Sequence, residues 1–276
     1  MIGVTGATGA LGGMVAHGLA EAGVHQRLLV RSPDRAPDLP GAHVVRCDFG
    51  DPPVARAALE GVTTLFMVSA SESEDRLDQH RAFVEAARDA GVGHVVYTSF
   101  FGASPTCTFT LGRTHAATEE HLRHSGMDWT FLRNNFYLDF LAHLPDEDGV
   151  IRGPAGEGRV AAVARADIAR AARAILTFPE PHAGATYDLT GPEALTFTEV
   201  AAILSELTGR DVTYHDETVE EAYESRRRWE APDWQYDAWV STYTAIRAGE
   251  LDGPTDHVRR LTGRAPTSLR ELVAQG

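Results

Sequence analysis

The sequence contains no lysine, so all 25 of its Lys and Arg residues are arginine. Any mechanism that uses a lysine amine as acid, base or nucleophile is therefore excluded. Acidic residues outnumber basic ones, and the formal net charge is -14. Nucleic-acid binding depends on basic side chains that neutralise phosphates, so we expect no nucleic-acid partner.

Cysteines and long apolar runs are also scarce. Cys47 and Cys107 are too few for a disulfide framework and lack metal-ligand spacing, so we expect a reducing compartment and no metal site. No apolar run approaches the ~20 residues of a membrane helix. Because residues 2–5 already have a strand-like sequence, we expect no signal peptide, no membrane partner and a cytoplasmic location.

Short apolar segments alternate with helical patterns through the first half of the sequence. Leu, Val, Phe and Ala recur at helical spacing over 10–22 and 74–90, and Gly23 and Gly91 follow as helix stops. The apolar segments between the helices are IGVT, QRLLVR, HVVRCD, TTLFMVS, HVVYTS and WTFLR. This alternation predicts an α/β fold with a Rossmann-type, doubly wound parallel sheet.

The second half changes character after the WTFLR segment. It contains an aromatic stretch (NNFYLDFLAHL), a Gly/Pro loop (GVIRGPAGEG), a helix that we expect Asp167 to cap, and the strand-like ATYDLTG. We predict that 1–134 form the Rossmann core, completed by segments near 160–190. Residues 135–276 would mainly form a small C-terminal α/β lobe that binds substrate.

The stretch VTGATGALGG places glycines at positions 6, 9 and 12, between a strand and a helix. In that context Gly6 makes the tight turn, Gly9 lets backbone approach a pyrophosphate, and Gly12 permits close helix packing. The helix N-terminus then offers free N–H groups to the anion. The predicted cofactor loop comprises Gly6, Thr8, Gly9, Ala10, Leu11 and Gly12. The alternative is a strand-to-helix turn that binds nothing.

The end of the second strand, in LLVRSPDR, predicts which nicotinamide cofactor is used. Arg31 stands where an arginine accepts the 2′-phosphate of NADP, so NADPH is favoured over NADH, and Arg35 could help. Alternatively, Arg31 is a solvated charge at a strand end. Asp48 follows the third strand, where it could reach the adenine or cap the helix that begins near Pro52.

Several stretches resemble the NmrA-like atypical short-chain dehydrogenase/reductases, and within them the NADPH-dependent quinone oxidoreductases and triphenylmethane reductases. They are TGATGALG, VRSP, HAATEEHLRHSGMDWTFLRNNFY, RADIARAARAILT and YDLTGPEALTFTEVAAIL. The resemblance spans most of the chain to about residue 210, and the tail from Tyr214 matches only loosely. It implies a Rossmann sheet, a small C-terminal lobe and an active site in the cleft between them.

The sequence departs from the superfamily at its catalytic pair. Typical members use Tyr-x-x-x-Lys, but here Leu111 and His115 occupy those places. The resemblance makes His115 the first candidate catalytic residue, as an acid or as an anchor for the cofactor ribose. Glu119 follows one helical turn later and could orient the imidazole or hold it charged. Without the resemblance, a histidine on the helix surface would be the preferred interpretation.

A ligand pocket is expected at the carboxyl ends of the strands, where doubly wound sheets bind their ligands. Adjacent amides at a strand end supply hydrogen bonds, so Asn135 is a second catalytic candidate and Asn134 a substrate contact. Phe and Tyr side chains there could stack on a flat acceptor, although such residues are more often core. The other candidates are Ser69 and Ser99 for the cofactor, and Phe100, Phe101, Phe136 and Tyr137 for the substrate.

Two further features are expected to be structural. The run Arg226 to Arg228 lies among glutamates and is predicted to be a solvated helix face. Trp229, Trp234 and Trp239 could close over the substrate. Their five-residue spacing fits no single helical face, however, so packing of the small lobe is the preferred interpretation.

The missing tyrosine acid limits the chemistry. Simple ketones need a positioned acid, whereas quinones delocalise the added charge and triarylmethane cations are neutralised by hydride. We therefore predict an NADPH-dependent reductase of quinones or similar dye-like acceptors, a monomer or homodimer whose partner is a small-molecule electron acceptor. The alternatives are a non-catalytic NADP-binding redox sensor of the NmrA type and a tailoring reductase of aromatic polyketide-like substrates.

Overall fold

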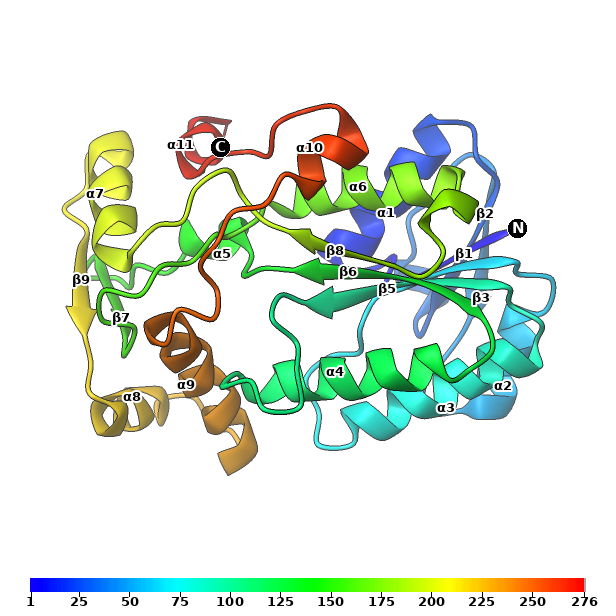
Figure 1. Cartoon of the computed structure of the whole chain (residues 1–276), viewed down its shortest axis with the longest axis horizontal. Helices are drawn as coiled ribbons and strands as arrows, with labels where there is room; N and C mark the ends of the chain where they lie inside the picture. The colour runs from blue at the N-terminus through cyan, green and yellow to red at the C-terminus, as the bar shows by residue number, and fades with distance from the viewer. Residues whose placement is uncertain (276) are drawn as a thin grey trace.

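A computed structural model describes residues 1–275. Its central sheet consists of seven parallel strands in the spatial order β3-β2-β1-β4-β5-β6-β8 (Figure 1). The order reverses beside β1, as in doubly wound nucleotide-binding sheets, and this confirms the predicted fold class. The strands are β1 (Ile2–Thr5), β2 (Gln26–Val30), β3 (Ala42–Arg46), β4 (Thr64–Met67), β5 (His94–Phe100), β6 (Asp128–Asn134) and β8 (Ala185–Leu189).

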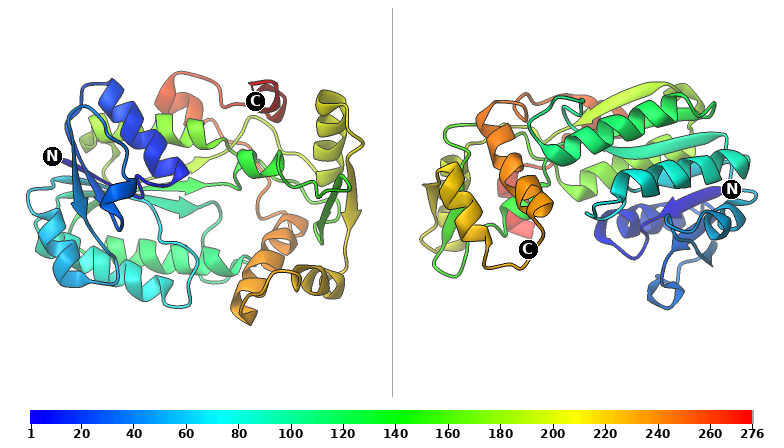
Figure 2. Two further views of the ribbon diagram at one scale, coloured as in Figure 1. Left: turned by 180° about the vertical axis from the view of Figure 1, so that it is seen from behind. Right: turned by 90° about the horizontal axis from the view of Figure 1, so that it is seen from below.

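Helices cover both faces of this sheet, which explains why its central strands are nearly continuous apolar runs. One face carries α1 (Ala10–Glu21) and α6 (Arg165–Thr177), and the other carries α2 (Pro52–Leu59), α3 (Arg76–Asp89) and α4 (Thr110–Arg123), as Figures 1 and 2 show. Leu19 and Ile175 lie in the first core, and Phe83 and Leu122 lie in the second. The predicted stops after α1 and α3 are glycines with φ of 70° and 84°.

The small lobe adjoins the carboxyl ends of β5, β6 and β8 (Figure 1). Its parallel strands are β7 (Val150–Gly153) and β9 (Thr213–Asp216), and its core includes Ile151, Phe197 and Leu204. Its helices are α5 (Leu138–Leu141), α7 (Phe197–Thr208), α8 (Val219–Arg226), α9 (Asp233–Arg247) and α11 (Leu269–Gln275). By contrast, α10 (His257–Thr262) packs on α6 and β8. Short 3₁₀ turns occur at η1 (Pro33–Arg35) and η2 (Glu180–His182). No helix within residues 1–275 has the length and apolarity to cross a membrane.

Two predicted helix caps are wrong. Asp167 lies inside α6, and its carboxylate accepts hydrogen bonds from the backbone N–H (2.6 Å) and hydroxyl (3.1 Å) of Thr267. It therefore ties the C-terminal segment to the sheet. Asp48 does not cap α2, because Asp51 accepts the bond from the Val54 N–H at 3.3 Å. A cap must directly precede its helix. Asp167 lies inside α6, which begins at Arg165, and Asp48 lies too far ahead of α2, which begins at Pro52 as expected.

Candidate functional site

The glycine loop connects β1 to α1 and is shaped by close backbone contacts. Gly6 has a φ of 64°, which favours glycine. A Cβ at Gly12 would lie 2.3 Å from the Gly6 carbonyl oxygen, so α1 can approach the loop only through a glycine. Gly9 is the N-cap, and within residues 1–275 no side chain bonds that helix end. Its N–H groups are therefore suited to an anion.

The remaining loop residues divide into an exposed and a buried set. Thr8 and Ala10 are exposed, whereas Leu11 is buried in the core and anchors the first turn of α1. A surface cavity of about 770 Å³ begins at Thr8 and Gly9 and includes Arg35. The polar backbone of the loop thus faces a cavity that is also lined by the positively charged side chain of Arg35.

The two predicted adenosine-side residues lie at adjacent strand ends. Arg31 directly follows β2 and is exposed. Asp48 follows β3, and its Oδ1 accepts a hydrogen bond from the Gly50 N–H at 3.0 Å. Since β2 and β3 are paired in parallel, both side chains begin at the same edge of the sheet as the glycine loop.

A second cleft, of about 690 Å³, lies between the sheet and the small lobe, within the size range of small-molecule sites. Polar groups enter it from the ends of β4, β5 and β6, as the sequence predicted. The predicted residues that line it are Ser69, Ser99, Phe100, His115, Asn134, Asn135, Phe136 and Tyr137. Phe101 does not line it and instead packs against the core of the small lobe.

His115 lines the cleft, but both of its ring nitrogens are bonded inside the protein. Arg76 Nη2 lies 3.0 Å from Nε2, and Tyr97 Oη lies 2.8 Å from Nδ1. A guanidinium only donates, so Nε2 accepts and Nδ1 carries the proton. Burial, and after it the positive charge of Arg76, holds the pKa of His115 well below the usual histidine value. His115 is therefore a neutral ring at neutral pH.

The predicted pairing of Glu119 with His115 is wrong. The Glu119 carboxylate is 1% exposed and accepts hydrogen bonds from Ser99 Oγ (2.6 Å) and Arg133 Nε (2.8 Å) and Nη2 (2.7 Å). Arg123 adds a further bond at 3.0 Å. Helical spacing put Glu119 and His115 on one face, but a carboxylate buried this deeply pairs with the cations around it. Glu119 consequently joins α4 to β5 and β6.

The two adjacent asparagines differ in their available hydrogen bonds. Asn135 Nδ2 donates to the Leu251 carbonyl at 3.0 Å, and its Oδ1 accepts from the Phe136 N–H at 2.7 Å. Asn134 is 2% exposed, yet within residues 1–275 neither polar atom of its side chain has a partner. Because an unpaired buried amide is costly, Asn134 is the one suited to a ligand.

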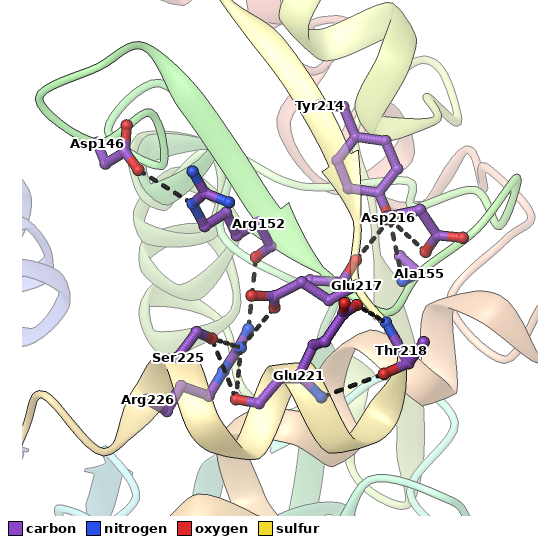
Figure 3. Close-up of polar contacts among 12 residues, drawn as sticks. Asp146, Arg152, Ala155, Tyr214, Asp216, Glu217, Thr218, Glu221, Ser225 and Arg226 are labelled. Carbon is purple, nitrogen blue, oxygen red and sulfur yellow. Dashed lines mark hydrogen bonds and ion pairs between the residues drawn. The ribbon is translucent and has the colours of Figure 1, made fainter.

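The small lobe supplies the opposite wall of the cleft, and Figure 3 shows its polar contacts. Arg226 Nη1 bonds Glu217 Oε2 at 2.8 Å, and Nη2 donates to the Arg152 carbonyl at 3.4 Å. Arg226 is 6% exposed, so the predicted solvated face is wrong at this position, although Arg227 and Arg228 are exposed. This buried ion pair fixes α8 against β7 and β9.

Trp229 and Trp239 line the cleft and meet edge to face, with ring centroids 6.1 Å apart. Trp229 is 49% exposed, so the prediction that it packs inside the lobe is wrong. Tertiary folding brings the two rings together from separate segments, which helical spacing could not indicate. They suit the flat face of an aromatic ligand.

A nucleotide cofactor fits these residues. The glycine loop leaves the N–H groups at the start of α1 free to bind a phosphate. The side-chain amide of Asn134, which has no hydrogen-bond partner within residues 1–275, lies at the end of β6. Within residues 1–275 no three His, Cys, Asp or Glu side chains are grouped so as to hold a metal ion.

Comparison with known proteins agrees with this geometry. Residues 6–179 match the model of a family described as NAD(P)H-binding. The chain belongs to this NAD(P)H-binding family. Quinone oxidoreductase 2 of Escherichia coli is 35% identical over 99% of this chain and 98% of its own. Its structure with NADPH has a TM-score of 0.91.

The triphenylmethane reductase of Citrobacter sp., solved with NADP(H), is 35% identical with a TM-score of 0.90 and covers 100% of this chain and 99% of its own. The resemblance to these two reductases is confirmed, and it extends past residue 210 to the end of the chain. The negative transcriptional regulator Nmra, at 20% identity and a TM-score of 0.76 over 99% of this chain and 94% of its own, shares the fold.

Sequence reasoning missed two members of the site, Arg76 and Tyr97. Arg76 stands in the first turn of an amphipathic helix, where an arginine is ordinarily solvated. Tyr97 stands in a buried strand and looks like core. Only the packing of α3 and β5 against α4 brings both to His115, and no local pattern marks that contact.

Proposed function

We propose that the protein is an NADPH-dependent oxidoreductase that transfers hydride to a quinone or a similar conjugated, dye-like acceptor. The observation that carries this proposal is the engagement of both His115 nitrogens: Nε2 accepts from Arg76, and the single ring proton on Nδ1 is donated to Tyr97 and not to a molecule in the aromatic-walled cleft. Quinones and triarylmethane cations need no strong positioned acid. The names of the two similar reductases, for a quinone and for triphenylmethane dyes, support the same acceptors.

We assign the cofactor as follows. The pyrophosphate is held by the glycine loop, which comprises Gly6, Thr8, Gly9, Ala10, Leu11 and Gly12. Arg31 binds the 2′-phosphate, and Asp48 contacts the adenosine side of the cofactor. Ser69, Ser99 and Asn134 hold the nicotinamide end, and the bound cofactor supplies the hydride. The orphaned Asn134 amide supports its part of this assignment.

At the acceptor end, the neutral His115 ring and the walls of Phe100, Phe136 and Tyr137 orient a flat molecule. The imidazole stacks on Phe100, with ring centroids 6.3 Å apart and an interplanar angle of 27°. Asn135 acts by positioning, because its amide already links Leu251 to Phe136. Phe101, outside the cleft, has no part in this proposal.

The test is NADPH consumption with a simple naphthoquinone and with a cationic triarylmethane dye, with NADH beside it. We expect turnover with NADPH, and in Arg31→Ala an increase of about tenfold in KM for NADPH with little change for NADH. His115→Ala should slow turnover, since the acceptor loses one wall of its site. Arg210→Ala removes an exposed arginine of the small lobe and is the matched control.

NADPH binding without reduction of either acceptor would contradict the proposal. The redox-sensor hypothesis would then be favoured, and a protein partner should be sought. An equal effect of Arg31→Ala on NADPH and NADH would contradict only the assignment of the 2′-phosphate to Arg31, and not the proposed activity.

A further inference from the structure

Arg76 carries a buried positive charge without a carboxylate partner. It is 4% exposed, and its three nitrogens bond neutral acceptors: Nε the Ala70 carbonyl (2.9 Å), Nη1 Thr114 Oγ1 (2.6 Å) and Nη2 His115 Nε2 (3.0 Å). Within residues 1–275 it forms no ion pair, unlike the buried Arg226. Burying an unpaired charge is costly, and an arginine stays charged in proteins.

This charge lies at the reacting end of the cleft. Arg76 opens α3, which packs beside α4 under the sheet (Figure 1), and its Ala70 contact belongs to the loop after β4. His115, the third contact, lines the cleft itself. Burial raises the pKa of Tyr137, another lining residue, and the positive charges of Arg165 and Arg76 oppose that rise.

Within residues 1–275 no neighbouring carboxylate is in contact with the Arg76 charge. His80 is neutral, because its Nε2 accepts from the Ala70 N–H at 2.8 Å and burial lowers its pKa to about 3. The carboxylate of Glu119 is paired with Arg133 and Arg123. Glu72, an exposed carboxylate that lines the cleft, attracts the Arg76 charge from a distance but forms no ion pair with it within residues 1–275. Tyr97 keeps its proton, since burial raises its pKa. Within residues 1–275 the protein thus places no anion of its own in contact with the Arg76 guanidinium, which leaves this charge able to act on an anion in the cleft.

We propose that Arg76 is a positioning residue of the reductase: its charge, acting through the neutral ring of His115, stabilises the anion that a neutral acceptor becomes on hydride transfer. This inference rests on the proposed function. Hydride carries two electrons and one proton from the dihydronicotinamide, which is oxidised, to the quinone, which is reduced to a hydroquinone anion. Water then supplies the second proton as the product leaves.

The proposal separates two classes of acceptor. A quinone becomes negative during the reaction, so a fixed positive charge nearby lowers its barrier. A cationic triarylmethane dye becomes neutral, so the same charge gives no such help and opposes binding of the dye. A merely structural role for Arg76 would affect both acceptors alike.

The experiment compares Arg76→Met and Arg76→Lys with the native protein on both acceptors. For Arg76→Met we expect kcat/KM for the quinone to fall by about tenfold or more, while the value for the dye is unchanged or higher. Arg76→Lys keeps the charge and should recover part of the quinone rate, and it serves as the second variant if Arg76→Met does not fold. Arg81→Met removes an exposed arginine of the same helix and should change neither rate.

A pH profile provides a second readout. Without Arg76, His115 Nε2 loses its donor and one cause of its lowered pKa, while burial still lowers that pKa. Quinone reduction by Arg76→Met should therefore become pH-dependent on acidification. The native profile should stay flat over the same range. Equal losses on both acceptors with a flat variant profile would overturn the inference alone. Native protein that binds NADPH and reduces neither acceptor would overturn the proposed function and this inference with it.

Discussion

The glycine loop after β1 is formed by backbone atoms of the single stretch 5–13. By contrast, side chains from α3, α4, β5 and β6 meet around His115. The loop depends on the absence of a Cβ at one position, and it is specified locally. The His115 cluster depends on hydrogen bonds between residues up to 39 positions apart, so each contact exists only when the whole sheet is assembled.

The substitution Gly12→Ala tests the locally specified loop. The new Cβ would meet the Gly6 carbonyl oxygen at 2.3 Å and the Thr5 oxygen at 2.7 Å, so the loop must move. We expect NADPH affinity to fall by about 100-fold or more, which corresponds to roughly 3 kcal/mol. Fluorescence titration of NADPH measures it. Gly18→Ala, whose nearest contact is the flexible Arg173 side chain, should bind NADPH normally.

Replacing Glu119 tests the contacts that join α4 to β5 and β6, which form only in the folded chain. Glu119→Gln leaves Arg133 and Arg123 without their buried carboxylate and weakens the bond to Ser99. We expect the free energy of unfolding to fall by about 3 kcal/mol in urea titration. The adjacent Glu120→Gln removes an exposed carboxylate and should cost less than about 0.5 kcal/mol. Similar losses in the two variants would contradict the buried role of Glu119.

Acid should weaken the polar cluster around His80. Burial lowers the pKa of His80 from 6.5 to about 3, so between these values the unfolded chain binds a proton that the native protein does not. The free energy of unfolding should therefore fall as pH decreases through 6.5, by up to about 1.4 kcal/mol per pH unit from this residue. Its full contribution is present above pH 6.5 and decreases until pH reaches the folded value.

Urea unfolding at several pH values, with His80→Asn beside the native protein, measures this effect. The variant should show a shallower fall below pH 6.5. His17→Gln, on the exposed side of α1, should keep the native slope. A variant slope equal to the native one would assign the acid sensitivity to other groups.

Much of the fold could be predicted from the sequence. The strand segments, the helix stops at Gly23 and Gly91, and the strand-to-helix placement of the glycine loop follow from local patterns, and the structure has them where expected. Three of the errors share one cause. Asp167, Glu119 and Arg226 carry charges that local spacing assigned to nearby partners or solvent, whereas the fold buries them against residues of other elements.

The sequence by itself determined which catalytic groups the protein can use and how closely its first helix can approach the glycine loop. Without lysine there is no Tyr-x-x-x-Lys pair, and with glycine at position 12 the helix can close on the loop. Only the tertiary structure decided the charge state of His115 and the isolation of Arg76. Protonation depends on burial and on charges within a few ångströms, and those neighbours come from strands and helices that meet only in the folded chain.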